Sequence, residues 1–202
     1  MLFGKRTYRS WVGDRENWDL LAAHQFNVLT SLGLRGGHKL LDIGCGSLRG
    51  GRLFIMYLEP GNYYGIEPAQ DVLRHAIDQE LGQEVIDKRR PSFDPNQTAN
   101  LGVFQERFDF ILAHSVLVHA PKAWIKVCFR EVKQTLKQGG KFVASLIFAE
   151  KDSGEAGWDY PQARFHTRET IATLAEQADL KLEVTDIRHP IKSPYTWIVL
   201  KH

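Results

Sequence analysis

Two acidic residues, Asp42 and Glu67, stand on either side of a glycine-containing turn, a pattern that could bind a nucleotide. Asp42 lies near the end of a short apolar stretch, and Gly44 and Gly46 follow, where a side chain would block either a tight turn or a ligand. Glu67 comes 23 positions after Gly44 (67 − 44 = 23), close to the spacing of a dinucleotide-type unit. A carboxylate there can accept two hydrogen bonds from vicinal ribose hydroxyls. The chemistry indicated is recognition of a ribose-bearing cofactor.

A strand, turn, helix and second strand would position these residues. The apolar residues before the turn predict a buried strand, residues 52–58 predict a helix packed on a sheet, and residues 62–66 predict a second strand. Pro68 restricts Glu67 to an extended conformation, which suits the end of that strand. Backbone N–H groups and the positive end of a helix dipole would then meet at the turn.

The sequence DIGCG at residues 42–46, with Glu67 after it, resembles the first two motifs of class I S-adenosylmethionine-dependent methyltransferases. This resemblance implies that Glu67 binds the ribose hydroxyls. It also implies that Asp42 helps to hold the methionine part of the cofactor, directly or through water. One departure is Leu48, which occupies the usual position of a third glycine. The cofactor-binding residues implied in this segment are Asp42, Gly44, Cys45, Gly46 and Ser47.

The resemblance extends to the third and fourth strands. A short strand around residues 92–93 would end at Asp94, which is either the residue that receives the adenine amino group or a plain turn residue. Residues 108–113 match the fourth strand, and His114 follows at the sheet edge where such folds bind ligands. We expect His114 either to contact the cofactor or to pack in the structure.

The chemistry implied is in-line displacement of a methyl group from a sulfonium, which positioning and exclusion of water can promote. An oxygen or nitrogen acceptor could need a base, and histidine suits that role near neutral pH. His119, just after the fourth strand, is the candidate catalytic base, and His166 is a second, weaker candidate. Cys45 reads as a small packing residue rather than a reactive thiol. The cysteines and histidines lack metal-ligand spacing, so no metal site is predicted.

Later elements complete the expected fold. A helix from Pro121 to Lys137 precedes a fifth strand at 141–148, and the segment LKQGGKF at 136–142 resembles the family's approach to that strand. Thr167 would cap another helix. Strands at 180–187 and 195–200 match the family's antiparallel closing hairpin. The predicted class is α/β, with a Rossmann-like, doubly wound, mainly parallel seven-stranded sheet and a closing antiparallel strand.

The N-terminal part of the chain is predicted to hold helices at 18–34 and, after the second strand, at 71–81, the latter beginning at Asp71. The whole of 1–202 is expected to be a single methyltransferase domain. Within it, 1–37 form an arm and helix, and 38–202 form the Rossmann-like core. The arm either packs on the domain or acts as a lid over the cofactor or acceptor.

The overall composition excludes several classes of function. The chain has 202 residues, a net charge of +2 and two cysteines, so no strong field favours nucleic acid and no disulfide framework is expected. It has no apolar run long enough for a membrane span and no secretory signal at the start. We therefore expect a cytoplasmic protein without a membrane partner.

The sequence favours an S-adenosylmethionine-dependent methyltransferase that acts on a small-molecule oxygen or nitrogen acceptor and releases S-adenosylhomocysteine. One alternative is a catalytically inactive S-adenosylmethionine-binding module that regulates a partner. A NAD(P)-dependent oxidoreductase is the other alternative, although the chain lacks the Tyr-x-x-x-Lys pairing of small reductases. The sequence leaves open the acceptor, the atom methylated and the oligomeric state.

Overall fold

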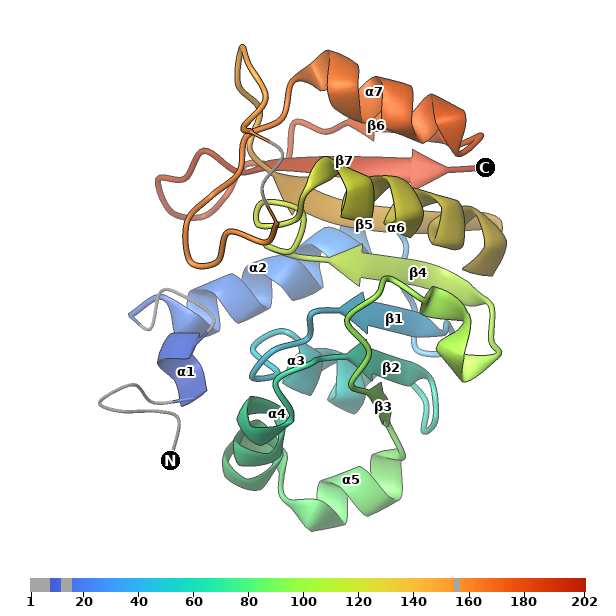
Figure 1. The fold of residues 1–202 in the computed structure, drawn as a ribbon. Coiled ribbons are helices and arrows are strands. Elements are labelled where there is room, and N and C mark those ends of the chain that lie inside the picture. The colour runs from blue at the N-terminus through green and yellow to red at the C-terminus, as the bar shows by residue number, and fades with distance from the viewer. Residues whose placement is uncertain (1–7, 12–15, 155–156) are drawn as a thin grey trace. The chain divides into compact units, whose positions relative to one another are not determined.

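The computed structural model describes residues 8–11, 16–154 and 157–202. The chain divides into two compact units, residues 1–96 and 97–202, and each combines helices with strands (Figure 1). The expected single domain over 1–202, with a boundary at residue 37, stays a prediction. No helix within the described ranges is long and apolar enough to cross a membrane.

The strands of the first unit are parallel and run in the order β3-β2-β1. They are β1 (Leu40–Ile43), β2 (Tyr63–Ile66) and β3 (Ser92–Asp94). Asp42 lies opposite Gly65, and Ile66 lies opposite Asp94. Every residue of β1 and β2 is buried, as expected for parallel strands covered on both faces. The carboxyl ends of the three strands therefore meet at one edge of the sheet, as the sequence predicts.

The described residues of the first unit also form five α-helical segments and one π-helical turn. They are α1 (Tyr8–Trp11), α2 (Trp18–Ser31), α3 (Gly51–Tyr57), α4 (Gln70–Ala76), η1 (Ile77–Leu81) and α5 (Gln83–Arg89). The helix predicted over 71–81 thus changes to π geometry at Ile77. Asp71 is not its cap, because the N-cap residue is Ala69 and makes no side-chain capping bond. The sequence did not predict α5, since residues 83–89 combine charges and turn formers.

The described part of the N-terminal arm packs on its own unit. The Tyr8 hydroxyl donates to Glu80 Oε1 at 2.7 Å, and Arg9 Nη2 lies 2.6 Å from the same oxygen. The Tyr8 ring meets Trp18 edge-on, with 6.4 Å between ring centroids. The arm's remaining residues, 1–7 and 12–15, lie outside the described residues, and its role as a lid stays a prediction.

The strands of the second unit run in the order β4-β5-β7-β6. They are β4 (Phe108–Ala113), β5 (Leu136–Leu146), β6 (Lys181–Val184) and β7 (Thr196–Lys201). β4 and β5 are parallel, whereas β7 is antiparallel to both β5 and β6. The described residues of the two units thus provide the seven strands, and the expected α/β class with an antiparallel closing hairpin is confirmed.

The helices of the second unit are η2 (Leu101–Phe104, a 3-10 helix), α6 (Lys122–Thr135) and α7 (Arg168–Gln177). α6 and α7 lie side by side along the sheet (Figure 1). Their inner faces are apolar, and residues such as Ile125, Phe129 and Ile171 are fully buried. His114 directly follows β4, and His119 lies in the turn between β4 and α6.

The boundary between α6 and β5 differs from the prediction. α6 ends at Thr135, and β5 begins at Leu136, before the two glycines that were expected to separate them. An irregularity in the ladder accommodates them: Phe108 lies opposite Leu136, and the next pair joins Phe110 to Lys141. A Cβ at Gly140 would lie 2.9 Å from the Lys137 carbonyl oxygen, so the bulge requires glycine there.

Thr167 is the N-cap of α7, as predicted. Its hydroxyl accepts a hydrogen bond from the Thr170 N–H at 3.0 Å. The Asp152 carboxylate binds the same turn, accepting from the Thr167 N–H at 2.7 Å and from the Thr170 hydroxyl at 2.6 Å. The cap therefore ties the loop after β5 to the start of α7.

Replacing the capping hydroxyl should destabilise the protein measurably. We expect Thr167→Ala to lower the free energy of unfolding by about 1 kcal/mol, because the Thr170 N–H loses its acceptor. Chemical denaturation measures this change. Thr167→Ser is the matched control and should keep nearly all of the stability. Equal loss in both variants would mean that the cap contributes nothing.

Candidate functional site

The glycine turn after β1 adopts a backbone that most residues avoid. Gly44 and Gly46 have φ values of 67° and 56°, in the left-handed region that glycine tolerates. The N–H groups of Gly44 and Cys45 both donate to the Ile66 carbonyl oxygen, at 2.8 and 3.1 Å. The turn is thereby tied to the end of β2. Leu48 also has a positive φ, 56°, so the position where the family has a third glycine keeps a left-handed backbone without one.

Glu67 fastens the same turn through its side chain. Its Oε2 accepts from the Gly46 N–H at 2.8 Å, and its Oε1 accepts from the Ala69 N–H at 2.8 Å. The residue is only 8% exposed, and burial raises the pKa of its carboxyl, against the effect of the two N–H donors. Each oxygen keeps further acceptor capacity. The carboxylate is thus held at the tip of β2 and can still accept hydrogen bonds from hydroxyl groups.

Asp42, the other acid of the pattern, is buried on the same unit. Its Oδ2 accepts from the Tyr63 hydroxyl at 2.8 Å. Burial raises the pKa of Asp42 to about 7; the Tyr63 bond lowers it, and the nearby charge of Glu67 raises it further. Asp42 is therefore close to its midpoint of ionisation at neutral pH, so a cation beside it would strongly favour the charged form.

Close packing around these acids requires two further glycines. A Cβ at Gly51 would lie 2.5 Å from the Tyr63 hydroxyl oxygen, and one at Gly65 would lie 2.9 Å from Cys45 Sγ. Cys45 is buried, and burial raises the pKa of its thiol well above the usual value. It packs as a small residue, as predicted. Tyr63 was missed because a tyrosine within an apolar strand gives no signal of its acidic partner.

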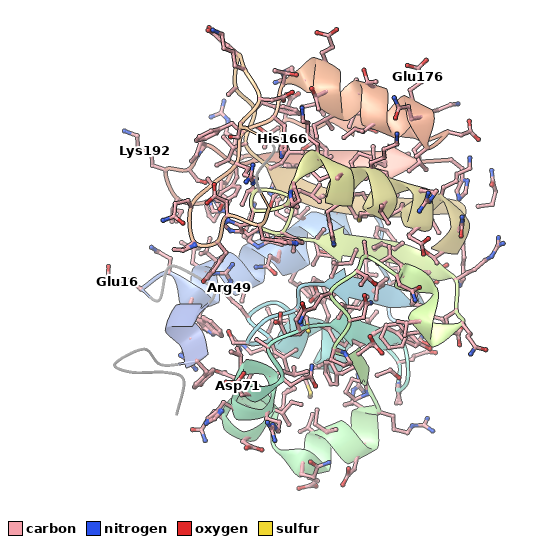
Figure 2. All side chains as sticks on the ribbon, viewed as in Figure 1. Glu16, Arg49, Asp71, His166, Glu176 and Lys192 are labelled. Carbon is pink, nitrogen blue, oxygen red and sulfur yellow. The ribbon has the colours of Figure 1, made fainter. Side chains whose placement is uncertain are left out.

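Two polar residues in the turn are buried. Ser47 is 0% exposed, and its hydroxyl has no hydrogen-bond partner in the part of the chain that the structure describes. The sequence left two alternatives for Arg49, a partner of the cofactor's carboxylate or an exposed helix residue. The second is wrong, because Arg49 precedes α3 and is 7% exposed (Figure 2). The turn extends through Gly50 before the helix begins, and the carboxylate role stays a prediction.

Asp94 ends the neighbouring strand beside Glu67. The Glu67 N–H donates to the Asp94 carbonyl oxygen at 3.0 Å, so the two acids lie on adjacent strand ends. Asp94 Oδ1 accepts from the Asn96 N–H at 2.9 Å, which forms a local turn of the kind aspartate favours. Its side chain is half-buried. The turn role is thus observed, and the adenine role stays a prediction.

In the second unit, His114 follows the last residue of β4. Its ring lies 5.2 Å from that of Trp197, centroid to centroid, and stacks at 13° on His189 with centroids 6.4 Å apart. The next residue, Ser115, has φ 57° and donates its N–H to the buried Ser145 hydroxyl at 2.8 Å. The packing alternative for His114 is thus observed, while a cofactor contact stays a prediction.

His119 is half-buried and held in one orientation. Its Nδ1 lies 2.7 Å from the Gln162 carbonyl oxygen, and because a carbonyl only accepts, Nδ1 carries the proton. The Tyr160 ring packs edge-on against it, with centroids 5.0 Å apart. Burial lowers the pKa of His119. The neutral ring therefore presents Nε2 as a proton acceptor, which is the form that a general base needs.

His166 is a poorer candidate. It is 2% exposed, and its backbone N–H donates to the Ile147 carbonyl oxygen beyond the end of β5. Burial lowers the pKa of its ring, but so little exposure leaves no room for an acceptor to reach it. Figure 2 labels it in the loop ahead of α7. Within the described residues no His, Cys, Asp and Glu side chains group as metal ligands would.

Residues 41–142 match the model of the methyltransferase domain family, just over half of the 202-residue chain. The chain therefore belongs to this family, and the resemblance to class I S-adenosylmethionine-dependent methyltransferases is confirmed. A search of curated proteins gave no match.

Solved structures of methyltransferases share the fold. One is the glycopeptide N-methyltransferase MtfA complexed with S-adenosylmethionine, at 13% identity and a TM-score of 0.66, covering 89% of this chain and 93% of that one. Another is magnesium protoporphyrin IX methyltransferase (ChlM) from Synechocystis PCC 6803 with the same cofactor bound, at 16% identity and a TM-score of 0.67, covering 96% and 89%. A third is an S-adenosylmethionine-dependent methyltransferase from Clostridium acetobutylicum ATCC 824, at 14% and 0.65, covering 93% and 92%.

These comparisons confirm the Rossmann-like fold and support the predicted cofactor. They do not test which residues of this chain bind it, so the roles of Asp42, Glu67 and Asp94 stay predictions, as do those of the residues in the turn.

The buried acid makes a testable contribution to stability. Because the pKa of Asp42 is about 7 when folded and about 3.8 when exposed, its contribution is fully present below about pH 4. It is lost as the pH rises to about 7, on the order of a few kcal/mol. Denaturant titrations of the wild type and Asp42→Asn at several pH values measure this.

We expect the free energy of unfolding of the wild type to fall, relative to that of Asp42→Asn, as the pH rises across this range. His119 and His166, with lowered pKa values, contribute with the opposite sign in both proteins, so the difference isolates Asp42. Parallel pH profiles of the two proteins would show that the acid is not perturbed.

Proposed function

We propose that this protein is a methyltransferase that uses S-adenosylmethionine to methylate an oxygen or nitrogen atom of a small-molecule acceptor. The observation that carries the proposal is the Glu67 carboxylate, held at the tip of β2 by the N–H groups of Gly46 and Ala69. Membership of the methyltransferase domain family supports it. Neighbours that act on a glycopeptide and on magnesium protoporphyrin IX support an acceptor of modest size.

The residues of the first unit fit the cofactor. Glu67 would accept hydrogen bonds from the ribose hydroxyls. The buried Ser47 hydroxyl, which lacks a protein partner in the described structure, would be a donor at the turn. Asp42 would bind the methionine ammonium group, directly or through water. Such a cation would favour the ionised form of an acid whose pKa is about 7. Asp94 would receive the adenine amino group.

S-adenosylmethionine, when bound, supplies an electrophilic methyl group and leaves as S-adenosylhomocysteine. The protein's part is to position the acceptor and to remove its proton where needed. His119 would act as the base through Nε2, because its Nδ1 proton is held by the Gln162 carbonyl oxygen. His114, packed at the end of β4, would contribute a cofactor contact.

The first test is calorimetric titration with S-adenosylmethionine, S-adenosylhomocysteine and NADH. We expect micromolar binding of the two sulfur compounds and none of NADH. In Glu67→Ala the affinity should fall at least about a hundredfold, since two hydrogen bonds to a charged acceptor are lost.

Glu59→Ala is the control for this titration, because it removes an exposed acid of the same unit. It should bind like the wild type. Binding of NADH alone would refute the proposal. Binding of the sulfur compounds without turnover of any acceptor would favour the inactive regulatory module.

A second test concerns the base. For an identified acceptor, His119→Gln should lower kcat by about 10²–10⁴-fold while leaving cofactor affinity unchanged. Because burial lowers the pKa of His119 below 6.5, the base is neutral above that value, and wild-type kcat/KM should decline only at lower pH.

His75→Gln, an exposed histidine of α4, is the control and should keep full activity. Unchanged kcat in His119→Gln would mean that transfer relies on positioning alone.

A further inference from the structure

The connection between β6 and β7 forms a cavity of about 350 Å³. Its lining includes half-buried apolar and aromatic residues, namely Ile187, His189, Ile191 and Tyr195. The exposed residues Asp186, Arg188 and Lys192 also line it. Figure 2 shows Lys192 at the outer side of this connection. The lining of the cavity thus combines apolar and aromatic side chains with charged ones.

The strand directions place this connection at the edge of the sheet where β4 and β5 end. β5 ends at Leu146, which lies opposite Thr196 at the start of β7, and β4 runs parallel to β5. The 185–195 segment therefore lies at the same edge as the carboxyl ends of β4 and β5, where α/β folds bind their ligands.

Aromatic stacking makes the cavity wall continuous with the end of β4. His189 lies against Tyr195, with centroids 5.8 Å apart at 32°, and both rings contact His114, each with centroids 6.4 Å from it. His114 directly follows β4. A flat group bound along this wall would lie beside the strand end.

Charge in the cavity favours an anion. The lining holds two cationic side chains, Arg188 and Lys192, against one carboxylate, Asp186. Among the described residues, neither cation has an ion-pair or hydrogen-bond partner. Guanidinium and ammonium groups bind phosphate and carboxylate by charge-assisted hydrogen bonds.

We propose that the β6–β7 cavity holds the methyl acceptor, and that this acceptor carries a phosphate or carboxylate beside a flat ring. Arg188 and Lys192 bind the anionic group, and the stacked wall of His189 and Tyr195 holds the ring. That the bound molecule is the methyl acceptor rests on the proposed methyltransferase function. The anion site itself depends only on the cavity.

The test measures binding of phenyl phosphate and of benzoate to the full chain, with benzyl alcohol as the neutral comparison. NMR signals of the histidine rings report it, and His189→Asn identifies the signal of His189. We expect at least one anion to shift that signal and to bind about tenfold or more tightly than benzyl alcohol. The anion that binds more tightly distinguishes phosphate from carboxylate.

The double variant Arg188→Gln/Lys192→Gln should weaken anion binding about tenfold or more. The matched control Lys126→Gln/Arg130→Gln removes two exposed cations of α6 and should bind the anions like the wild type. Anions that bind no better than benzyl alcohol, or equal weakening in the control, would overturn the proposal.

Cofactor titration separates this inference from the function on which it rests. We expect Arg188→Gln/Lys192→Gln to bind S-adenosylhomocysteine like the wild type. With an identified acceptor, its KM should rise about tenfold or more at nearly unchanged kcat. If the wild type binds the anions but no S-adenosyl compound, the anion site stands and the methyltransferase function fails. Turnover of uncharged acceptors alone, with KM unaffected in the double variant, would refute the acceptor role.

Discussion

The bond between the Glu67 carboxylate and the Gly46 N–H is the constraint on which the first unit's candidate site depends. It joins the turn after β1 to the end of β2 through a buried charged acceptor. A backbone N–H directed at a carboxylate is a strong hydrogen bond in a water-poor site. The two N–H bonds to Ile66 reinforce it. Together these bonds fix the turn to the end of β2.

That turn tolerates little extra volume. Gly51, at the start of α3, and Gly65, in β2, lie where a Cβ would collide with Tyr63 and Cys45, so the packing around the acids requires both glycines. Asp42 and Glu67 are both buried in this packing, and burial raises the pKa of each. A buried acid close to its midpoint of ionisation, as Asp42 is, responds strongly to a nearby positive charge.

In the second unit, the direction of the strands decides where the β6–β7 connection lies. An antiparallel β7 reverses the chain direction, so the connection from β6 arrives at the edge where β4 and β5 end. A loop carried by rigid strands can vary its residues without disturbing the core. Here the loop presents cations over an aromatic wall that begins at His114. The glycine turn with Glu67 and the β6–β7 connection thus lie in different parts of the chain.

How far the sequence predicts the structure depends on whether a residue's role is set by its neighbours along the chain. The glycine turn, Glu67 at the strand end, the Thr167 cap and the antiparallel closing hairpin all follow from local patterns, because spacing, β-strand alternation and capping are properties of short segments. The methyltransferase family was likewise evident from residues 42–46 and Glu67.

Tertiary structure alone decided the partners of those residues. Tyr63 donates a hydrogen bond to Asp42 from the neighbouring strand, and Arg49 is buried. Neither feature leaves a pattern in the sequence. Likewise, Arg188 and Lys192 read as ordinary surface charges until strand pairing brings their loop to the edge beside β4 and β5. Such contacts join residues far apart in the chain, and only the packed sheet specifies which of them meet.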